Sequence, residues 1–134
     1  MEIIMKKRLV EMAIQAREKA YAPFSHFCVG AALLTSDGEI FTGVNIENSS
    51  YGATICAERS AFAAAISTGR RDFKAIAVVG APESEIIDEL CYPCGICRQF
   101  MREFCSEDFE IILFDGKNIV MRTLGEILPH GFKL

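Results

Sequence analysis

Residues 73–80, which read FKAIAVVG, limit the folds open to this chain more than any other feature of the sequence. A short apolar run of this kind is typical of a β-strand that is buried on both faces. Gly69 ends the helix predicted before the run, and an acidic stretch over residues 82–90 is predicted to form a loop after it. The run therefore favours a sheet with helices layered on it.

Hydrophobic periodicity and turn signals predict the other elements around this strand. Helices are predicted over residues 6–20, from about 56 to 67, from 93 to about 104 and over 123–128, and strands over 28–35, 40–45, 111–114 and 119–121. The order αββαβαββα predicts an α/β fold, a single-domain αβα layered sandwich whose mixed five-stranded sheet has helices on both faces. At 134 residues the chain has room for one domain, so 1–134 is expected to be a single domain.

Two of the predicted helices carry further expectations about burial. The helix over 56–67 is apolar almost all round, so we expect it to be buried centrally. Pro93 is expected to open the next helix as a first-turn proline. The core-spaced side chains of that helix are Ile96, Phe100, Met101 and Phe104. Phe24 is also expected in the core, whereas His26 and His130 are expected on the surface.

Charge and composition disfavour several classes of partner. Fourteen basic and eighteen acidic residues give a net charge of −4, whereas nucleic-acid backbones are bound by clustered Lys and Arg. No run approaches the roughly 20 apolar residues of a membrane-spanning helix, and the start of the chain lacks the apolar core of a signal peptide. We therefore expect a cytoplasmic protein with no nucleic-acid or membrane partner. Its six cysteines are then expected to be ligands, catalysts or buried small residues rather than disulfide partners.

Two short segments, CAE at 56–58 and PCGIC at 93–97, stand at the predicted starts of helices. The positive end of a helix dipole favours a thiolate over a thiol, and so favours metal binding. Cys56, Cys94 and Cys97 could therefore hold a tetrahedral zinc ion and leave its fourth position for water. Such an open position distinguishes a catalytic zinc site from a closed structural one.

Glu58 and Arg59 complete the local pattern. A glutamate two positions after one ligand can lie beside the metal without binding it, take a proton from the zinc-bound water and deliver it to a substrate. Zinc lowers the pKa of bound water to about 7 where its protein ligands are neutral histidines, and thiolate ligands should weaken that effect. We expect Arg59 to hydrogen-bond a ligand sulfur and withdraw charge from it.

The chain resembles the short, homotetrameric, zinc-dependent cytidine deaminases of the cytidine/deoxycytidylate deaminase superfamily over nearly its whole length. The stretches that match are YAPFSHFCVGAAL at 21–33, GVNIENSSYG at 43–52, CAERSA at 56–61 and PCGICRQ at 93–99. A metal ligand followed by x-E, together with P-C-x-x-C, is a signature of zinc deaminases that act on nucleobases. The resemblance implies a cytidine deaminase-like catalytic domain with one Zn²⁺ per subunit. It also implies hydrolysis of cytidine and deoxycytidine to uridine and deoxyuridine, with release of ammonia, in pyrimidine salvage.

The same resemblance implies roles for individual residues. Cys56, Cys94 and Cys97 match the zinc ligands, and Glu58 matches the group that moves protons as the zinc-bound water attacks C4 of the pyrimidine ring. The residues that match substrate-binding groups are Phe27 on the pyrimidine, Asn45 and Glu47 on the ribose hydroxyl, the backbone of Ala57 on the ring carbonyl, and Tyr51 and Phe132 from neighbouring subunits. The implied assembly is a homotetramer with shared active sites for a small nucleoside. Two departures from the family pattern are Ile96, where alanine is usual, and a longer, more acidic loop over 82–91.

The cysteines also allow other interpretations. Cys91, Cys94, Cys97 and Cys105 could form a closed structural zinc site, and Cys94 with Cys97 a redox pair, but neither alternative uses the segment 56–58. Cys105, like Cys28, is otherwise expected to be a buried small hydrophobe, and Cys91 a non-ligand near the metal.

Other functions are also open. A related deaminase could act on an aminopyrimidine antibiotic or a free base, but Asn45 and Glu47, unless they form only a polar end to a strand, favour a ribose in the site. A deaminase of RNA or DNA is disfavoured by the acidic charge and by Phe132 as a pocket-closing residue. A zinc-stabilised interaction module without catalysis is the last alternative.

Overall fold

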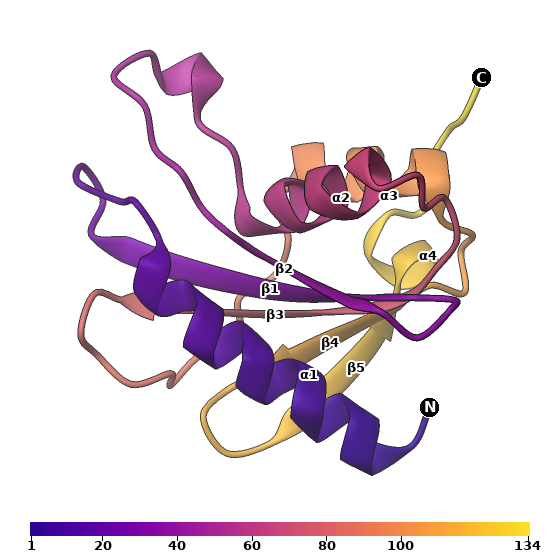
Figure 1. The fold of residues 1–134 in the computed structure, drawn as a ribbon, viewed down its shortest axis with the longest axis horizontal. Helices are drawn as coiled ribbons and strands as arrows, with labels where there is room; N and C mark the ends of the chain where they lie inside the picture. The colour runs from indigo at the N-terminus through magenta and orange to yellow at the C-terminus, as the bar shows by residue number, and fades with distance from the viewer.

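The computed structural model describes all residues, 1–134, and is built around a five-stranded sheet with the strand order β2-β1-β3-β4-β5 (Figure 1). The strands are β1 (Phe27–Thr35), β2 (Ile40–Val44), β3 (Phe73–Pro82), β4 (Glu110–Phe114) and β5 (Ile119–Thr123). The helices are α1 (Ile3–Ala16), α2 (Ala57–Ser67), α3 (Gly95–Phe104) and α4 (Leu124–Ile127), with 3₁₀ turns η1 (Arg17–Lys19) and η2 (Tyr51–Ala53). Because β3 pairs antiparallel with β1 and parallel with β4, the predicted mixed sheet is confirmed.

Helices cover the sheet on both faces (Figure 1). On one face α1 packs through Leu9 and Ala13 against side chains of β1, β3 and β4. On the other face α2, α3 and α4 share a second core cluster with the opposite side chains of the same strands. Every residue of β3 from Ala75 to Ala81 is buried between the two layers. The αβα sandwich predicted from the run 73–80 is therefore confirmed.

The start of α2 lies so close to β2 that only glycine fits at position 43. A Cβ atom on Gly43 would lie 2.3 Å from the backbone nitrogen of Ala61 and 2.5 Å from the backbone oxygen of Ala57. Ala57, Ala61 and Ala65 follow one another along the helix and are fully buried. Small residues on both elements therefore bring the helix start, where Cys56 stands, up against the sheet.

Two predicted helix boundaries are wrong. The first helix runs over residues 3–16 instead of 6–20, and the chain then tightens into η1. There the buried side chain of Arg17 turns inward and donates hydrogen bonds to the carbonyl groups of Cys28, Ala81, Pro82 and Glu85. Pro93 lies before α3 instead of in its first turn, because Cys94 is the N-cap. A proline suits that extended position equally well, since it has no N–H to satisfy.

Some predicted burials are also wrong. One face of α2 is buried, but Ala63 and Ala64 are exposed, because the neighbouring layers reach the helix from only one side. Ile96 is 66% exposed in the first turn of α3, and Phe24 is 52% exposed in the loop before β1. Met101 is buried as predicted, whereas Phe100 and Phe104 are half-buried beside Phe62. As expected, Cys28 and Cys105 are buried, and His26 and His130 are exposed. The loop predicted over 82–90 begins at residue 83 in the structure, because β3 extends through Pro82.

None of the four helices has the length and hydropathy that crossing a membrane would require.

Candidate metal centre and substrate site

The starts of α2 and α3 meet and bring three cysteines together. Cys56 is the N-cap of α2 and Cys94 the N-cap of α3, both with extended backbone, and Cys97 lies in the first turn of α3. The Sγ atoms of the three residues all lie within 4.8 Å of one another, and those of Cys56 and Cys94 are 3.6 Å apart. The positive ends of two helix dipoles therefore face the same small space.

The cluster contains three potential ligands and no fourth. Neither Cys91 nor Cys105 belongs to it, although both lie among the hydrophobic side chains of the same core. Burial raises the pKa of both thiols to about 12, so they are poor thiolate donors. The geometry therefore matches an open three-ligand site and does not match the closed four-cysteine alternative.

Charge is shared unevenly within the cluster. Hydrogen bonds from Cys97 and from Arg59 lower the pKa of Cys56 to about 5, whereas the hydrogen bond to Cys56 and burial raise the pKa of Cys97. The shifts are opposite because one sulfur carries the negative charge and the other donates to it. The guanidinium Nη2 of Arg59 lies 3.6 Å from the Cys56 sulfur, and its buried Nε has no partner. The expected contact between Arg59 and a cysteine sulfur is therefore present.

Glu58 lies beside the cluster but is not part of it. The residue is in the first turn of α2 and is 3% exposed. Burial raises the pKa of Glu58 to about 7, and the nearby Cys56 charge acts in the same direction. A buried carboxyl group with a pKa near neutrality can both accept and release a proton, which is what general acid–base chemistry requires.

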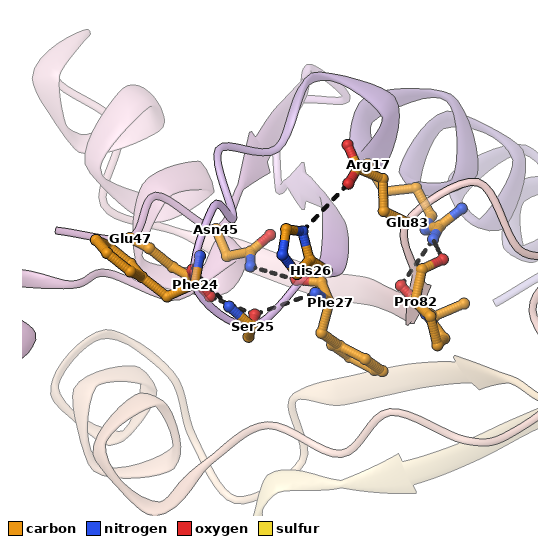
Figure 2. A network of polar contacts seen from close by, with 10 residues as sticks. Arg17, Phe24, Ser25, His26, Phe27, Asn45, Glu47, Pro82 and Glu83 are labelled. Atoms are coloured by element: carbon orange, nitrogen blue, oxygen red, sulfur yellow. Dashed lines mark hydrogen bonds and ion pairs between the residues drawn. The ribbon is translucent and has the colours of Figure 1, made fainter.

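A polar network holds the segment that carries Phe27 (Figure 2). Asn45 lies between two backbone groups of β1: its Oδ1 accepts from the Val29 N–H at 2.9 Å, and its Nδ2 donates to the Phe27 carbonyl at 2.8 Å. The Glu47 carboxylate accepts hydrogen bonds from the backbone of Phe24 and Ser25 and from the Ser25 hydroxyl. Asn45 and Glu47 thus do more than end a strand, because they organise the residues around Phe27.

Tyr51 and Phe132 are remote from each other within one chain. Tyr51 is 79% exposed and stands on η2, at the tip of a segment that extends beyond the sheet and away from α2 (Figure 1). Phe132 is 65% exposed in the C-terminal segment at the opposite side of the molecule, where its carbonyl accepts a hydrogen bond from Gln99 at 3.0 Å. One chain therefore does not bring these two aromatic residues to a single pocket.

The main hollows of the chain also avoid the cysteine cluster. None of the five main depressions on its surface is lined by Cys56, Glu58, Cys94 or Cys97. The hollow that includes Phe27 has a volume of about 240 Å³ and extends toward the acidic loop at Glu85, Asp88 and Glu89. The metal centre of an isolated chain is therefore not enclosed by a deep pocket.

Three further residues support the site and were not assigned a role from the sequence. Ser25 contacts Glu47, and Arg98 donates to the carbonyl groups of Pro93 at 2.7 Å and Ile127 at 2.6 Å, which ties the start of α3 to α4. A Cβ atom on Gly80 would lie 2.8 Å from the Phe27 ring and 2.9 Å from the Cys91 sulfur, so Gly80 leaves room for both. Ser25 and Arg98 lie inside the stretches 21–33 and 93–99 that match the family, so the sequence indicated that these two positions could matter. No motif around Gly80 indicates a role for it.

Comparisons with known proteins agree with this geometry. A family model of the cytidine and deoxycytidylate deaminase zinc-binding region matches residues 4–113. The cytidine deaminase of Halalkalibacterium halodurans is 48% identical over 128 residues, which are 95% of this chain and 93% of that protein. The blasticidin-S deaminase of Bacillus cereus is 36% identical, over 90% of this chain and 87% of that protein.

A solved structure extends the likeness to the fold. The crystal structure of the cytidine deaminase from Burkholderia pseudomallei superposes with a TM-score of 0.85 at 45% identity, covering 94% of this chain and 98% of that one. The arrangement of the sheet and its covering helices is thus shared with a known cytidine deaminase. The chain belongs to the cytidine and deoxycytidylate deaminase family.

Proposed function

We propose that this protein is a zinc-dependent hydrolase that converts cytidine and deoxycytidine, with water, to uridine and deoxyuridine and releases ammonia. The observation that carries the proposal is the cluster of Cys56, Cys94 and Cys97, with the buried Glu58 beside it. The relatives named cytidine deaminases support the choice of substrate. The whole chain, 1–134, acts as one catalytic domain in pyrimidine salvage.

The residues of the cluster fit a zinc ion. Thiolate sulfur is a preferred zinc ligand, and three protein ligands with an open fourth position are usual for catalytic zinc. Cys56, Cys94 and Cys97 would hold the ion, one per subunit. When bound, zinc supplies a Lewis acid that lowers the pKa of water and so generates a nucleophile near neutral pH. Thiolate ligands weaken the effect of zinc on the pKa of bound water. Arg59 withdraws charge from the Cys56 sulfur and so limits that weakening.

Glu58 moves the protons of the reaction. It takes a proton from the attacking water and passes it to the ring nitrogen of the pyrimidine, next to C4. The water oxygen adds to C4 as the ring nitrogen gains that proton. Glu58 then carries the second water proton from the new hydroxyl group to the amine, so that the C–N bond breaks, ammonia leaves and a carbonyl group forms at C4. One carboxyl group can serve these transfers in turn because its pKa of about 7 lies close to the working pH.

The substrate is held by groups on three different segments. The ring of Phe27 packs on the pyrimidine, and the backbone of Ala57 binds the ring carbonyl oxygen. Asn45 donates a hydrogen bond to the sugar hydroxyl, and the Glu47 carboxylate accepts one from it. Asn45 has an N–H to spare for this role, because its Nδ2 carries two hydrogens and only one backbone carbonyl accepts from it.

The active enzyme is a homotetramer with shared sites. Tyr51 and Phe132 reach the pockets of neighbouring subunits, which accounts for their exposure in a single chain and for the absence of a deep hollow over the cysteines. The exposed face of α2, with Ala63 and Ala64, offers small apolar residues for such contacts. The enzyme works in the cytoplasm on a small nucleoside, without a nucleic-acid or membrane partner. Three of its six cysteines are assigned to the zinc ion, and none of the six is paired in a disulfide.

The experiment that tests the function follows the absorbance change as the purified, zinc-loaded protein converts cytidine to uridine. Cytosine and blasticidin S are the comparison substrates, since one relative is a blasticidin-S deaminase. Turnover of cytidine well above that of both supports the proposal. If the protein turns over cytosine or blasticidin S but not cytidine, the same chemistry acts on a different substrate. If it turns over none of the three compounds, the protein is a zinc-binding module without catalysis.

A further inference from the structure

The hydroxyl group of Ser25 stands between two residues of the substrate site (Figure 2). Its Oγ accepts a hydrogen bond from the Phe27 N–H at 3.0 Å and donates one to Oε2 of Glu47. A serine hydroxyl has a single proton. Because the Phe27 N–H occupies a lone pair of the oxygen, that proton is directed toward Glu47.

The two oxygens of Glu47 are held differently. Oε1 accepts from the backbone N–H groups of Phe24 at 2.9 Å and Ser25 at 3.1 Å, whereas the only protein group bonded to Oε2 is the Ser25 hydroxyl. The same hydrogen bond is the main reason that the pKa of Glu47 lies below its usual range. Ser25 therefore lowers the pKa of the Glu47 carboxyl group and sets the direction of its Oε2 atom.

The neighbouring groups do not depend on Ser25 in this way. The amide of Asn45 is anchored at both ends by the backbone of Phe27 and Val29. Phe27 would lose the hydrogen bond from its N–H to Ser25, but its carbonyl stays bonded to Asn45 and the residue stays paired with Pro82 in the β1–β3 ladder. Removal of the Ser25 hydroxyl should consequently disturb Glu47 and leave Phe27 and Asn45 in place.

We infer that Ser25 is a positioning residue for sugar recognition: it aligns the Glu47 carboxylate to accept a hydrogen bond from a sugar hydroxyl of the bound nucleoside. The inference rests on the proposed function, because it assigns Glu47 to the sugar of a pyrimidine nucleoside. It specifies which substrates should be affected. A nucleoside with a 2′- or 3′-hydroxyl group needs an aligned Glu47, whereas one that lacks both does not.

The experiment compares Ser25→Ala, Ser25→Thr and the wild-type enzyme on cytidine and on 2′,3′-dideoxycytidine. Binding of the dideoxy compound is measured as its own KM or as inhibition of cytidine turnover. Hydrogen bonds to charged groups are strong enough that Ser25→Ala should raise the KM for cytidine about tenfold, with kcat within about twofold. Binding of the dideoxy compound should change less than about threefold. Ser25→Thr, which keeps the hydroxyl, should resemble the wild type.

Controls separate this role from a structural one. Ser106→Ala changes an exposed serine remote from the site and should leave both substrates unaffected. Zinc content and melting temperature of Ser25→Ala should match the wild type, and an NMR titration should show the pKa of Glu47 rising. If the alanine variant does not fold, Ser25→Cys replaces it, because a thiol is a similar shape and a weak donor.

Two results would overturn the role of Ser25. One is an unchanged KM for cytidine in the alanine variant of an active enzyme. The other is an equal loss for both nucleosides that threonine does not restore, since this would mean a general effect on the loop. A wild-type enzyme that fails to act on cytidine would overturn the proposed function itself, and this inference with it.

Discussion

The candidate metal centre and the proposed outer rim of the substrate site, formed by Phe27, Tyr51 and Phe132, are built in opposite ways. Cys56, Glu58, Cys94 and Cys97 lie on helix starts, and all of them except the exposed Cys94 are buried or half-buried. One chain supplies all four. Phe27, Tyr51 and Phe132 lie on loops and strand ends and are each at least 39% exposed. Chemistry that needs a dry, fixed geometry is thus placed on rigid elements, and binding groups are placed where another surface can complete them.

Substitutions in the metal centre and in the outer rim should therefore affect different properties of the enzyme. A change in the metal centre should reduce the rate of the chemical step with the assembly intact. A change in the rim should weaken substrate binding with the metal in place.

The largest effect is expected from Glu58→Gln. Zinc content and fold should persist, because the substitution keeps the shape of the side chain and Glu58 is not in the cysteine cluster. Turnover should fall about 10³–10⁴-fold, the upper range for a general acid–base group. Glu103→Gln, an exposed residue on α3, is the matched control and should retain wild-type rates. A Glu58→Gln enzyme with a tenth of wild-type activity would remove Glu58 from the proposed role.

Removal of the metal with a chelator should make the cysteine cluster more reactive toward alkylation than the cysteines outside it. In the metal-free protein at pH 7, Cys56 has a pKa of about 5 and is a thiolate, whereas Cys91 and Cys105, with pKa values of about 12, are protonated. Alkylation of Cys56 should exceed that of the other two at least about 100-fold. Zinc should protect Cys56. Mass spectrometry of peptides after brief alkylation gives the comparison, and equal labelling of all three thiols would contradict it.

Arg59→Ala should reduce kcat about 10–100-fold, because a hydrogen bond to a charged partner in a half-buried site is lost. The pH–rate profile should move to higher pH, since the cluster would retain more negative charge and water would ionise less readily. In the metal-free variant the pKa of Cys56 should rise, so alkylation at pH 6 should slow. An unchanged pH–rate profile together with a raised KM would instead mean that Arg59 contributes to substrate binding.

Phe132→Ala should raise the KM for cytidine about tenfold and leave zinc content unchanged, because it removes apolar packing and no ligand. Activity should also fall on dilution together with the tetramer, as measured by light scattering of the active enzyme. A monomer that is fully active at assay concentration would show that the rim is complete in one chain. The metal chemistry would be unaffected by that result.

Gly80→Ala should have the smallest effect. The new Cβ would meet the Phe27 ring at 2.8 Å and the Cys91 sulfur at 2.9 Å, and both are side chains that can move. Displacement of the partly exposed ring should raise KM about two- to fivefold with kcat unchanged. Adding Cys91→Ala should restore part of the loss by relieving one of the two contacts. A fall in kcat without a change in KM would place Gly80 in the metal centre.

Features that depend on neighbours along the chain could be predicted from the sequence alone. The buried run at 73–80 predicted a strand covered on both faces, because side-chain pattern and strand period are local properties. The spacing of Cys94 and Cys97, and of Cys56 and Glu58, predicted which residues a helix start would place together. Errors remained where several local solutions are equally good, as for Pro93, which suits the first turn of a helix and the extended segment before it.

Tertiary structure decided what depends on residues far apart in the chain. The approach of α2 to β2 at Gly43, the exposure of Ile96 and Ala63, and the burial that raises the pKa of Glu58 all depend on which layers meet. So does the role of Ser25 beside Glu47, a contact between residues 22 positions apart. Packing between distant segments sets dielectric, access and hydrogen-bond direction, and no local pattern encodes those quantities.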